Sequence, residues 1–172
     1  MKTIGRLFVL LLLFSASGFA QNHDLTVFAG AHFPGKVTLT SGGSNLTDPA
    51  NFGTFGVRFG SGGLWGHEET FAYMPNFLDS NSKAVILTGN LRIQAPLPVV
   101  KPYVTGGMGT LFTSGNGVSD LGTKFALNYG GGIKIMKGPV GVRFDLRGYA
   151  VPSVESQTLN MGEATVGVVF GF

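Results

Sequence analysis

The final ten residues, from Glu163 to Phe172, alternate between apolar side chains and small or polar ones. The apolar parity holds Ala164, Val166, Val168, Phe170 and Phe172. A period of two predicts a β-strand with one face in an apolar medium. Chain termini usually fray into water, whereas a barrel pairs its last strand with its first and so removes both edges. We therefore expect a closed barrel with one face in lipid.

The opening of the chain has the pattern of a secretory signal peptide. Lys2 and Arg6 supply a short positive region, and residues 7–14 (LFVLLLLF) supply an apolar core. That core is shorter than the roughly 20 residues that a spanning helix needs. We expect residues 1–20 to be a cleaved signal peptide and residues 21–172 to form one barrel domain, with an uncleaved anchor as the alternative.

Composition excludes several classes of protein. Loss of Lys2 and Arg6 lowers the Lys and Arg count from 12 to 12 − 2 = 10, against 9 Asp and Glu, so the mature chain is nearly neutral. We expect no nucleic-acid partner, because binding of that kind needs clustered basic residues. The chain has no cysteine, which excludes disulfides and a Cys-based zinc site. Charged residues make up only 12%, about half the share usual in soluble domains.

Eight segments with period-two character follow one another along the mature chain. They cover residues 25–33, 54–60, 65–74, 83–93, 103–112, 124–135, 140–149 and 163–172. Tight Gly or Pro turns alternate with polar loops over residues 34–51, 75–82, 113–122 and 151–162. Residues 103–112 contain so many glycines that the sequence does not show which side chains face the lumen and which face lipid. This order predicts an all-β fold, an eight-stranded antiparallel up-and-down transmembrane β-barrel, with short periplasmic turns and longer extracellular loops.

A soluble lipocalin-type barrel is the alternative fold. Its outward side chains would carry the charges, whereas here the charges lie opposite the apolar face. The segments VGVRFDLRGY (Val140 to Tyr149) and VGVVFGF (Val166 to Phe172) resemble the small outer-membrane β-barrel proteins, the family of the OmpA transmembrane domain and OmpX. Unlike OmpA, the chain ends at the barrel, so we expect no peptidoglycan-binding domain.

The resemblance has implications for location and partners. It implies residence in the cell outer membrane, in contact with its lipid and lipopolysaccharide, and a monomeric barrel. It also implies that Phe170 and Phe172 form the signal that the barrel assembly machinery recognises. Trp65, Tyr103 and the same two phenylalanines fall near tight-turn ends, where an aromatic girdle is expected.

Charged side chains gather on the parity that faces the lumen. We expect an ion-pair network there, comprising Arg58, Glu68, Arg92, Lys134, Arg143, Asp145, Arg147 and Glu163. Glu68 is expected to be shared by Arg58 and Arg92, and Glu163 to meet Arg147. An eight-stranded barrel is only just wide enough for side chains to fill it, so the network should plug the lumen. A narrow, gated path that favours anions is the alternative.

The chain offers little for catalysis. Nucleophilic hydrolysis needs a Ser, a His and a group that orients the His. The histidines are His23, His32 and His67, and no strand carries His and Ser two apart on its lipid-facing side. His67 and Glu69 could form a metal pair, but two ligands are too few to predict a metal site. We expect no cofactor, no metal and no enzyme activity, and a structural or surface-binding role carried by extracellular loops. A channel for small solutes or anions and a lipid-modifying enzyme are the alternatives.

Overall fold

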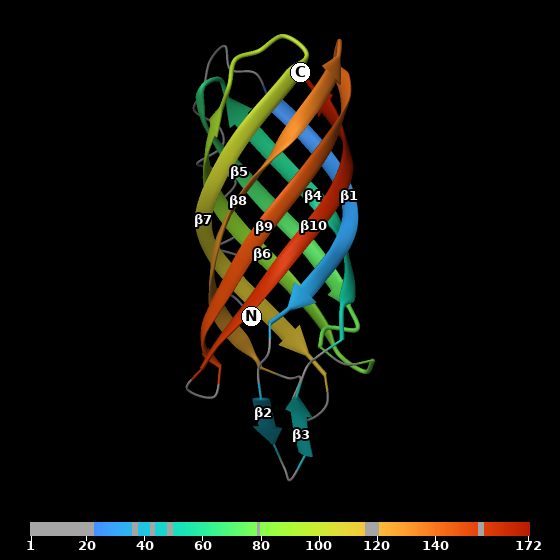
Figure 1. Ribbon diagram of the computed structural model, residues 1–172, viewed down its shortest axis with the longest axis vertical. Helices are drawn as coiled ribbons and strands as arrows, with labels where there is room; N and C mark the ends of the chain where they lie inside the picture. Colours follow the sequence, from blue (N-terminus) through green and yellow to red (C-terminus); the bar gives the residue numbers. More distant parts are fainter. Residues whose placement is uncertain are drawn as a thin grey trace, which may run out of the picture.

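The computed structural model describes residues 23–35, 38–41, 44–47, 50–78, 80–115, 121–154 and 157–172. Within these ranges ten strands form, and eight of them close into an antiparallel barrel (Figure 1). The expected signal peptide, residues 1–20, lies outside the described residues. In the described part of the chain, no helix is long and apolar enough to cross a membrane.

The barrel strands coincide with the predicted segments, and most extend a few residues further. They are β1 (His23–Pro34), β4 (Phe52–Gly62), β5 (Trp65–Pro75), β6 (Lys83–Gln94), β7 (Val100–Ser114), β8 (Thr123–Lys137), β9 (Val140–Val154) and β10 (Gln157–Gly171). Each pairs with its neighbour in sequence, and β10 closes the barrel against β1 from Asp24 opposite Gly171 to Pro34 opposite Met161. The predicted eight-stranded up-and-down barrel is confirmed.

Two of the expected loops contain strand structure. The loop over residues 34–51 includes a hairpin of β2 (Thr38–Ser41) and β3 (Ser44–Thr47), which projects beyond the barrel (Figure 1). Much of the loop expected over residues 151–162 belongs to β9 and β10. Its polar composition suggests a loop, but the two strands continue their ladder past the point where β1 ends, so pairing overrides composition.

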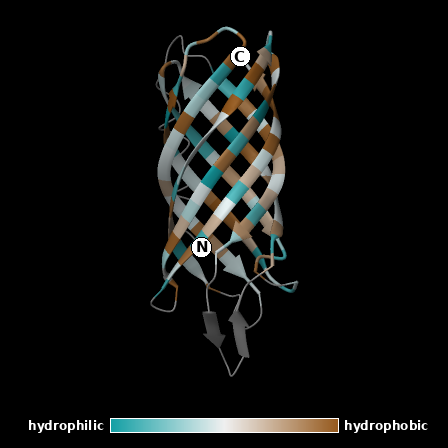
Figure 2. Ribbon diagram, viewed as in Figure 1, coloured by the Kyte–Doolittle hydropathy of each residue, from teal (hydrophilic) through white to brown (hydrophobic). Residues whose placement is uncertain are grey.

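Side chains alternate strictly between the two faces of the wall, and the hydropathy of the ribbon alternates with them (Figure 2). Leu146 is 70% exposed and its neighbour Arg147 only 4%. In β9 and β10 the apolar even-numbered residues face outward over the middle of the strands. In β7, whose facing the sequence left open, Tyr103 and Leu111 point inward and Met108 points outward.

The ends of the barrel differ. One end, here called the tight-turn end, carries the short β4–β5 and β8–β9 connections, where Gly62 and Gly138 have φ values of 102° and 65°. Such positive φ is readily available only to glycine. The opposite end, the long-loop end, carries the β2–β3 hairpin (Figure 1). Strand β1 begins at the tight-turn end, and β10 ends there.

The interior at the long-loop end is mostly apolar, with the buried polar side chains of Thr54 and Asn128 among its residues. We call the apolar cluster the apolar plug; its members are Phe28, Phe52, Ala72, Met74, Phe77, Leu78, Ala84, Ile86, Leu111, Ala126, Tyr149, Val151, Val154, Leu159 and Met161. Phe77 comes from the β5–β6 loop and is fully buried, and its backbone N–H donates to the carbonyl of Ser82 at 3.1 Å. The neighbouring Asn76 and Leu78 take positive φ values of 55° and 62°, which turn the loop into the barrel mouth.

Candidate functional site: a charge network in the lumen

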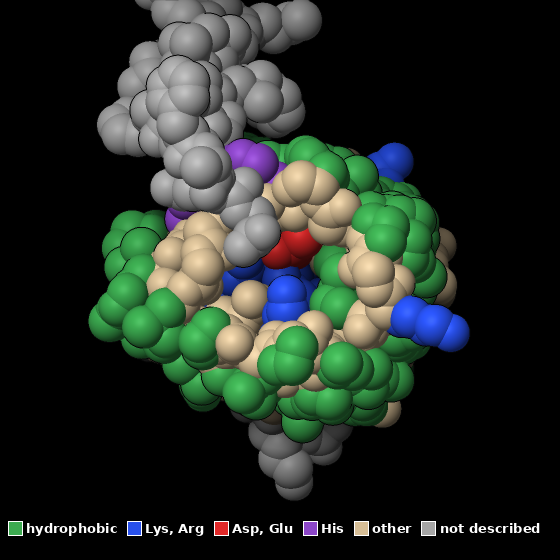
Figure 3. Space-filling model, turned by 90° about the horizontal axis from the view of Figure 1, so that it is seen from above, with side chains coloured by type: hydrophobic (Ala, Val, Ile, Leu, Met, Phe, Trp, Pro, Cys, Tyr) green, Lys and Arg blue, Asp and Glu red, His purple; other side chains and the backbone are tan. Residues whose placement is uncertain are grey.

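Between the apolar plug and the tight-turn end, the lumen is filled with charge. Seen from the tight-turn end, Lys, Arg, Asp and Glu side chains lie inside a ring of apolar side chains (Figure 3). The structure places all eight predicted lumen residues there, each less than 5% exposed. They come from β4, β5, β6, β8, β9 and β10, so the network joins strands around most of the barrel.

Glu68 on β5 holds the centre of the network. Its Oε1 lies 2.5 Å from Nη2 of Arg147, and its Oε2 lies 2.7 Å from Nη1 of Arg143 and 3.5 Å from Nη1 of Arg92. The expected pairing with Arg92 is present, but the two shorter contacts come from β9, across the lumen. Arg58 contacts other carboxylates instead of forming the expected ion pair with Glu68.

Asp145 is the second shared carboxylate. It accepts hydrogen bonds from Nη1 of Arg58 at 2.9 Å, Nε of Arg143 at 2.8 Å and Nη2 of Arg147 at 3.0 Å. The hydroxyl of Tyr103 also donates to Asp145 and accepts from Nε of Arg143 at 2.8 Å. The expectation that Tyr103 belongs to an aromatic girdle is therefore wrong, because its side chain points into the lumen and is 5% exposed.

Glu163 lies where the charge network meets the apolar plug. It accepts from Nη2 of Arg58 at 2.5 Å and lies 3.2 Å from Nε2 of His32. The guanidinium of Arg58 also covers the ring of Phe28 at 3.8 Å. Glu163 and Arg147 are opposite each other in the ladder, but the expected pair between them is replaced because Arg147 extends across the lumen to Glu68.

Asp24 closes the network at the tight-turn end, and sequence reasoning missed it. Its Oδ2 accepts from Nζ of Lys134 at 2.6 Å and lies 3.1 Å from Nη1 of Arg92. Asp24 shares the inward parity of Thr26, but it precedes the predicted first strand by one residue. His32 also faces the lumen, and Glu163, its partner in the β1–β10 ladder, supplies the carboxylate beside it.

The network brings five cationic side chains, from Lys134 and four arginines, together with four carboxylates. Burial of an unpaired charge is costly, so each group must have opposite charges close by. Sharing supplies them: Glu68 and Asp145 each contact three arginines. Such an arrangement cross-links the interior and leaves the positions of the charged groups fixed.

The other predicted residues lie on the outer wall. Phe170 and Phe172 are 42% and 71% exposed near the tight-turn end, as is Trp65 at 70%. His67 lies 3.6 Å from Glu69 on the outward parity of β5. Over the described ranges, no group of three or more His, Asp or Glu side chains is placed to hold a metal ion.

A closed antiparallel wall with an apolar outer face and a polar interior defines the class of transmembrane β-barrels. Residues 7–172 match the family model of the outer membrane protein beta-barrel domain, and the chain belongs to this family. It is an outer-membrane protein. In such barrels short turns face the periplasm and longer loops face outward, so the tight-turn end is periplasmic and the long-loop end extracellular.

Solved structures share the fold at low sequence identity. Neisserial surface protein A is 14% identical with a TM-score of 0.65, and the match covers 90% of this chain and 100% of that one. The N-terminal barrel domain of Pseudomonas aeruginosa OprF is also 14% identical, with a TM-score of 0.60 and coverage of 88% and 97%. The outer membrane enzyme PagL is 14% identical with a TM-score of 0.50 and coverage of 86% and 98%. Curated protein sequences give no match.

Proposed function

We propose that this protein is a closed, non-conducting outer-membrane barrel that serves as a scaffold for extracellular binding loops. The observation that carries the proposal is the double closure of its lumen, by the charge network on the periplasmic side and by the apolar plug on the extracellular side. An open pore would need a continuous hydrated path through both.

The charge network obstructs the lumen mechanically. Glu68 and Arg147 come from opposite walls and meet at 2.5 Å, so their side chains cross the full width of the interior. An ion would have to pass between groups that are held in ion pairs with one another. Opening a path would separate buried opposite charges, which costs about 3 to 5 kcal/mol when one partner of a buried pair is lost.

The apolar plug obstructs the lumen chemically. Met74, Ile86, Leu111 and Leu159 are each fully buried within it. A narrow apolar constriction excludes water, and ions cannot cross it without losing hydration. A gate that works by exchange of ion-pair partners would leave this second barrier in place.

Planar-bilayer recording of the refolded protein tests the proposal. We expect no discrete conductance steps from wild-type barrels whose insertion is verified by heat-modifiable gel mobility. A triple variant that makes the plug polar and removes the central carboxylate, Ile86→Ser, Leu159→Ser and Glu68→Ala, shows whether the assay can detect an opened lumen. Reproducible unitary steps from the wild type would contradict the closed state and favour the anion channel.

The extracellular end is the proposed binding region. The β2–β3 hairpin extends beyond the barrel, where a rigid wall can present it to the cell exterior (Figure 1). Replacement of residues 36–49 by a short Gly-Ser linker should leave the barrel folded. Cells displaying either form would be compared on panels of immobilised glycans and extracellular-matrix proteins. We expect adhesion that depends on the hairpin; equal binding by both forms, or none by the wild type, would contradict the proposal.

We further propose that the protein catalyses no reaction. His32 is fully buried between the charge network and the ring of Phe52, out of reach of a membrane lipid. His67 pairs with Glu69, and His23 stacks on Phe59 and Phe172. Mass spectrometry of lipid A from cells that overproduce the protein should match cells that carry an empty vector. A changed acyl pattern would support the lipid-modifying alternative.

A further inference from the structure

We propose that the periplasmic mouth of the barrel is a binding site for a small carboxylate that carries a short apolar group. This inference goes beyond the closed-scaffold function and does not depend on it. It rests on a cavity, on a buried amide in its lining whose oxygen has no hydrogen-bond partner in the described residues, and on the local balance of charge.

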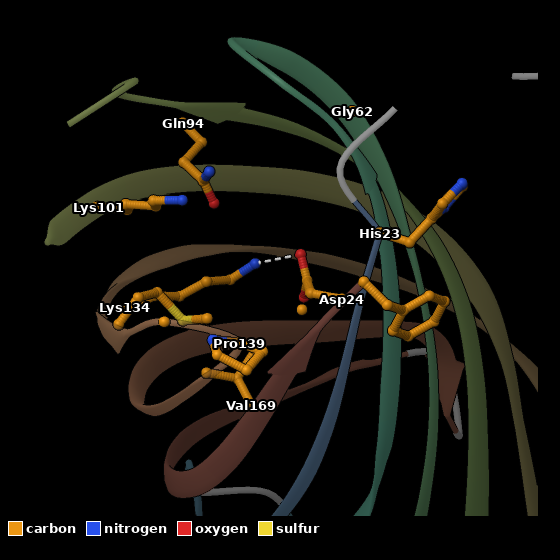
Figure 4. Close-up of a pocket in the computed structure, with 12 residues that line it drawn as sticks. His23, Asp24, Gly62, Gln94, Lys101, Lys134, Pro139 and Val169 are labelled. Carbon is orange, nitrogen blue, oxygen red and sulfur yellow. Dashed lines mark hydrogen bonds and ion pairs between the residues drawn. The ribbon is translucent and has the colours of Figure 1, made fainter. Parts of the chain in front are cut away.

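The cavity has a volume of about 280 Å³ and opens at the tight-turn end. Gln94, Lys101 and Lys134 approach it from one side, and Lys134 faces Asp24 across it (Figure 4). Met136 and Val169 contribute apolar surface to the same cavity. Its volume is at the lower limit of small-molecule sites, so a ligand of a few heavy atoms fits better than a lipid.

Gln94 supplies the observation that points to a ligand. Its side chain is 8% exposed and lines the cavity, and its Oε1 has no hydrogen-bond partner in the described residues. A buried amide without a partner is unfavourable. Because a turn of the terminal torsion exchanges the oxygen and the NH₂ group, Gln94 can offer two N–H donors to an anion. In that orientation the NH₂ group can donate to an oxyanion in the cavity.

The charge around the cavity favours a monovalent anion. Lys101 adds a positive charge to a network whose five cations already outnumber its four carboxylates, and Arg92 contacts both Asp24 and Glu68. Lys134 and Arg92 both approach Oδ2 of Asp24, at 2.6 and 3.1 Å, so this single oxygen is shared by two cations. The remaining positive charge attracts a carboxylate, and the walls at Met136 and Val169 accept a short apolar group.

Methionine methyl NMR of the refolded barrel in neutral detergent can test the site. Butyrate is the probe, and butyramide is its uncharged match in size. We expect the Met136 methyl signal to shift saturably with butyrate and to stay still with butyramide. The methyl signals of Met74 and Met161, which lie in the apolar plug, should not move with either.

Three variants assign the contacts. Lys101→Met removes a charge, and Gln94→Met removes the amide at similar length; each should weaken butyrate affinity about ten-fold, the scale of a hydrogen bond to a charged group. Lys137→Met, on the exposed side of β8, is the matched control and should bind like the wild type. Absence of saturation in the wild type would overturn the site. Equal affinity of all three variants, or equal binding of butyramide, would show non-specific partition and overturn it as well.

Discussion

Glu68 on β5 and Arg147 on β9 belong to diametrically opposite strands of the barrel, and their side chains meet at 2.5 Å. Four strand steps separate β5 from β9 in either direction around the closed sheet. The shared carboxylate therefore bridges the two walls at their greatest separation. Arg143 joins the same carboxylate at 2.7 Å, so Glu68 holds two arginines of β9 against the opposite wall.

Removal of the charge on Glu68 should destabilise the barrel more than any other single change of charge. Glu68→Gln leaves Arg143 and Arg147 without their shortest contact, and loss of one partner in a buried pair costs about 3 to 5 kcal/mol. Urea unfolding in phospholipid vesicles, followed by Trp65 fluorescence, would measure the change. Glu69→Gln on the outward face of the same strand should stay within about 0.5 kcal/mol. Equal effects of the two substitutions would contradict the central role of Glu68.

Two adjacent residues on β9, Leu146 and Arg147, should require side chains of opposite polarity. Leu146 faces lipid, so Leu146→Arg should cost about 2 to 4 kcal/mol, the usual penalty for a cation near the bilayer midplane. Arg147 faces the lumen, so Arg147→Leu should cost a similar amount, because it leaves Glu68 and Asp145 each one cation short. Both free energies of unfolding come from the same vesicle titration. A tolerated Leu146→Arg would place that side chain outside the membrane.

The hydroxyl group of Tyr103 should contribute to the stability of the barrel. Tyr103→Phe keeps the ring over Arg143 but removes the group that donates to Asp145 and accepts from Arg143. We expect a loss of about 1 to 3 kcal/mol in the free energy of unfolding, the range for hydrogen bonds to charged groups. Tyr73→Phe is the matched control, since Tyr73 packs edge-on against Phe55 on the outer parity. If both substitutions cost the same, the hydroxyl of Tyr103 lies outside the network.

Gly132 should be required because it leaves space for Tyr103. A Cβ atom at Gly132 would lie 2.0 Å from the carbonyl oxygen of Phe144 and 2.5 Å from the hydroxyl of Tyr103. Gly132→Ala should therefore shift Tyr103 and cost about 1 to 3 kcal/mol, as overpacking does. A Cβ at Gly89 would meet nothing within 4 Å, so Gly89→Ala should be neutral or slightly stabilising. Thermal unfolding of the two variants in the same detergent measures this difference, and equal melting temperatures would contradict the requirement for Gly132.

We propose that Phe170 and Phe172 form the assembly signal, that the barrel assembly machinery reads it, and that the inserted barrel is a monomer in contact with lipid and lipopolysaccharide. Phe172→Ala should slow the appearance of the heat-modifiable form in pulse-chase experiments in cells, with little effect on the stability of refolded protein. Phe125→Ala, on the lipid-facing parity of β8, is the control. Equal assembly rates would contradict the proposed signal. Light scattering in detergent tests the monomer.

The sequence predicted the architecture well because alternation is a local property. Outside β7, lipid-facing residues such as Val27, Phe144 and Phe170 can be assigned from their own neighbours in the chain. The glycines of β7 carry no side chain that distinguishes the faces, so the inward position of Tyr103 required the register of three strands. The apolar plug was missed for a related reason. Its residues are apolar but face the lumen, so their hydropathy does not tell the inner face from the outer one.

Which charged residues pair within the lumen was harder to predict than which residues face it. Parity places a residue inside, but long side chains reach beyond the adjacent strand. Arg147 lies opposite Glu163 in the ladder yet extends to Glu68, and Arg58 takes Glu163 instead. Such choices depend on the width of the barrel and on every other charge in it. Ion pairs of this kind cannot be predicted by comparing adjacent strands alone.

The distribution of the charge network along the chain imposes an order on barrel formation. Glu68 is synthesised 79 positions before Arg147, and both of its shortest contacts come from β9. Until β9 and β10 arrive, the earlier strands hold a carboxylate without the two arginines that contact it most closely. The late strands bring its missing counter-charges and the β1–β10 seam together. Drying of the lumen and closure of the wall should therefore be one event, and a chain truncated before β9 should stay hydrated and open.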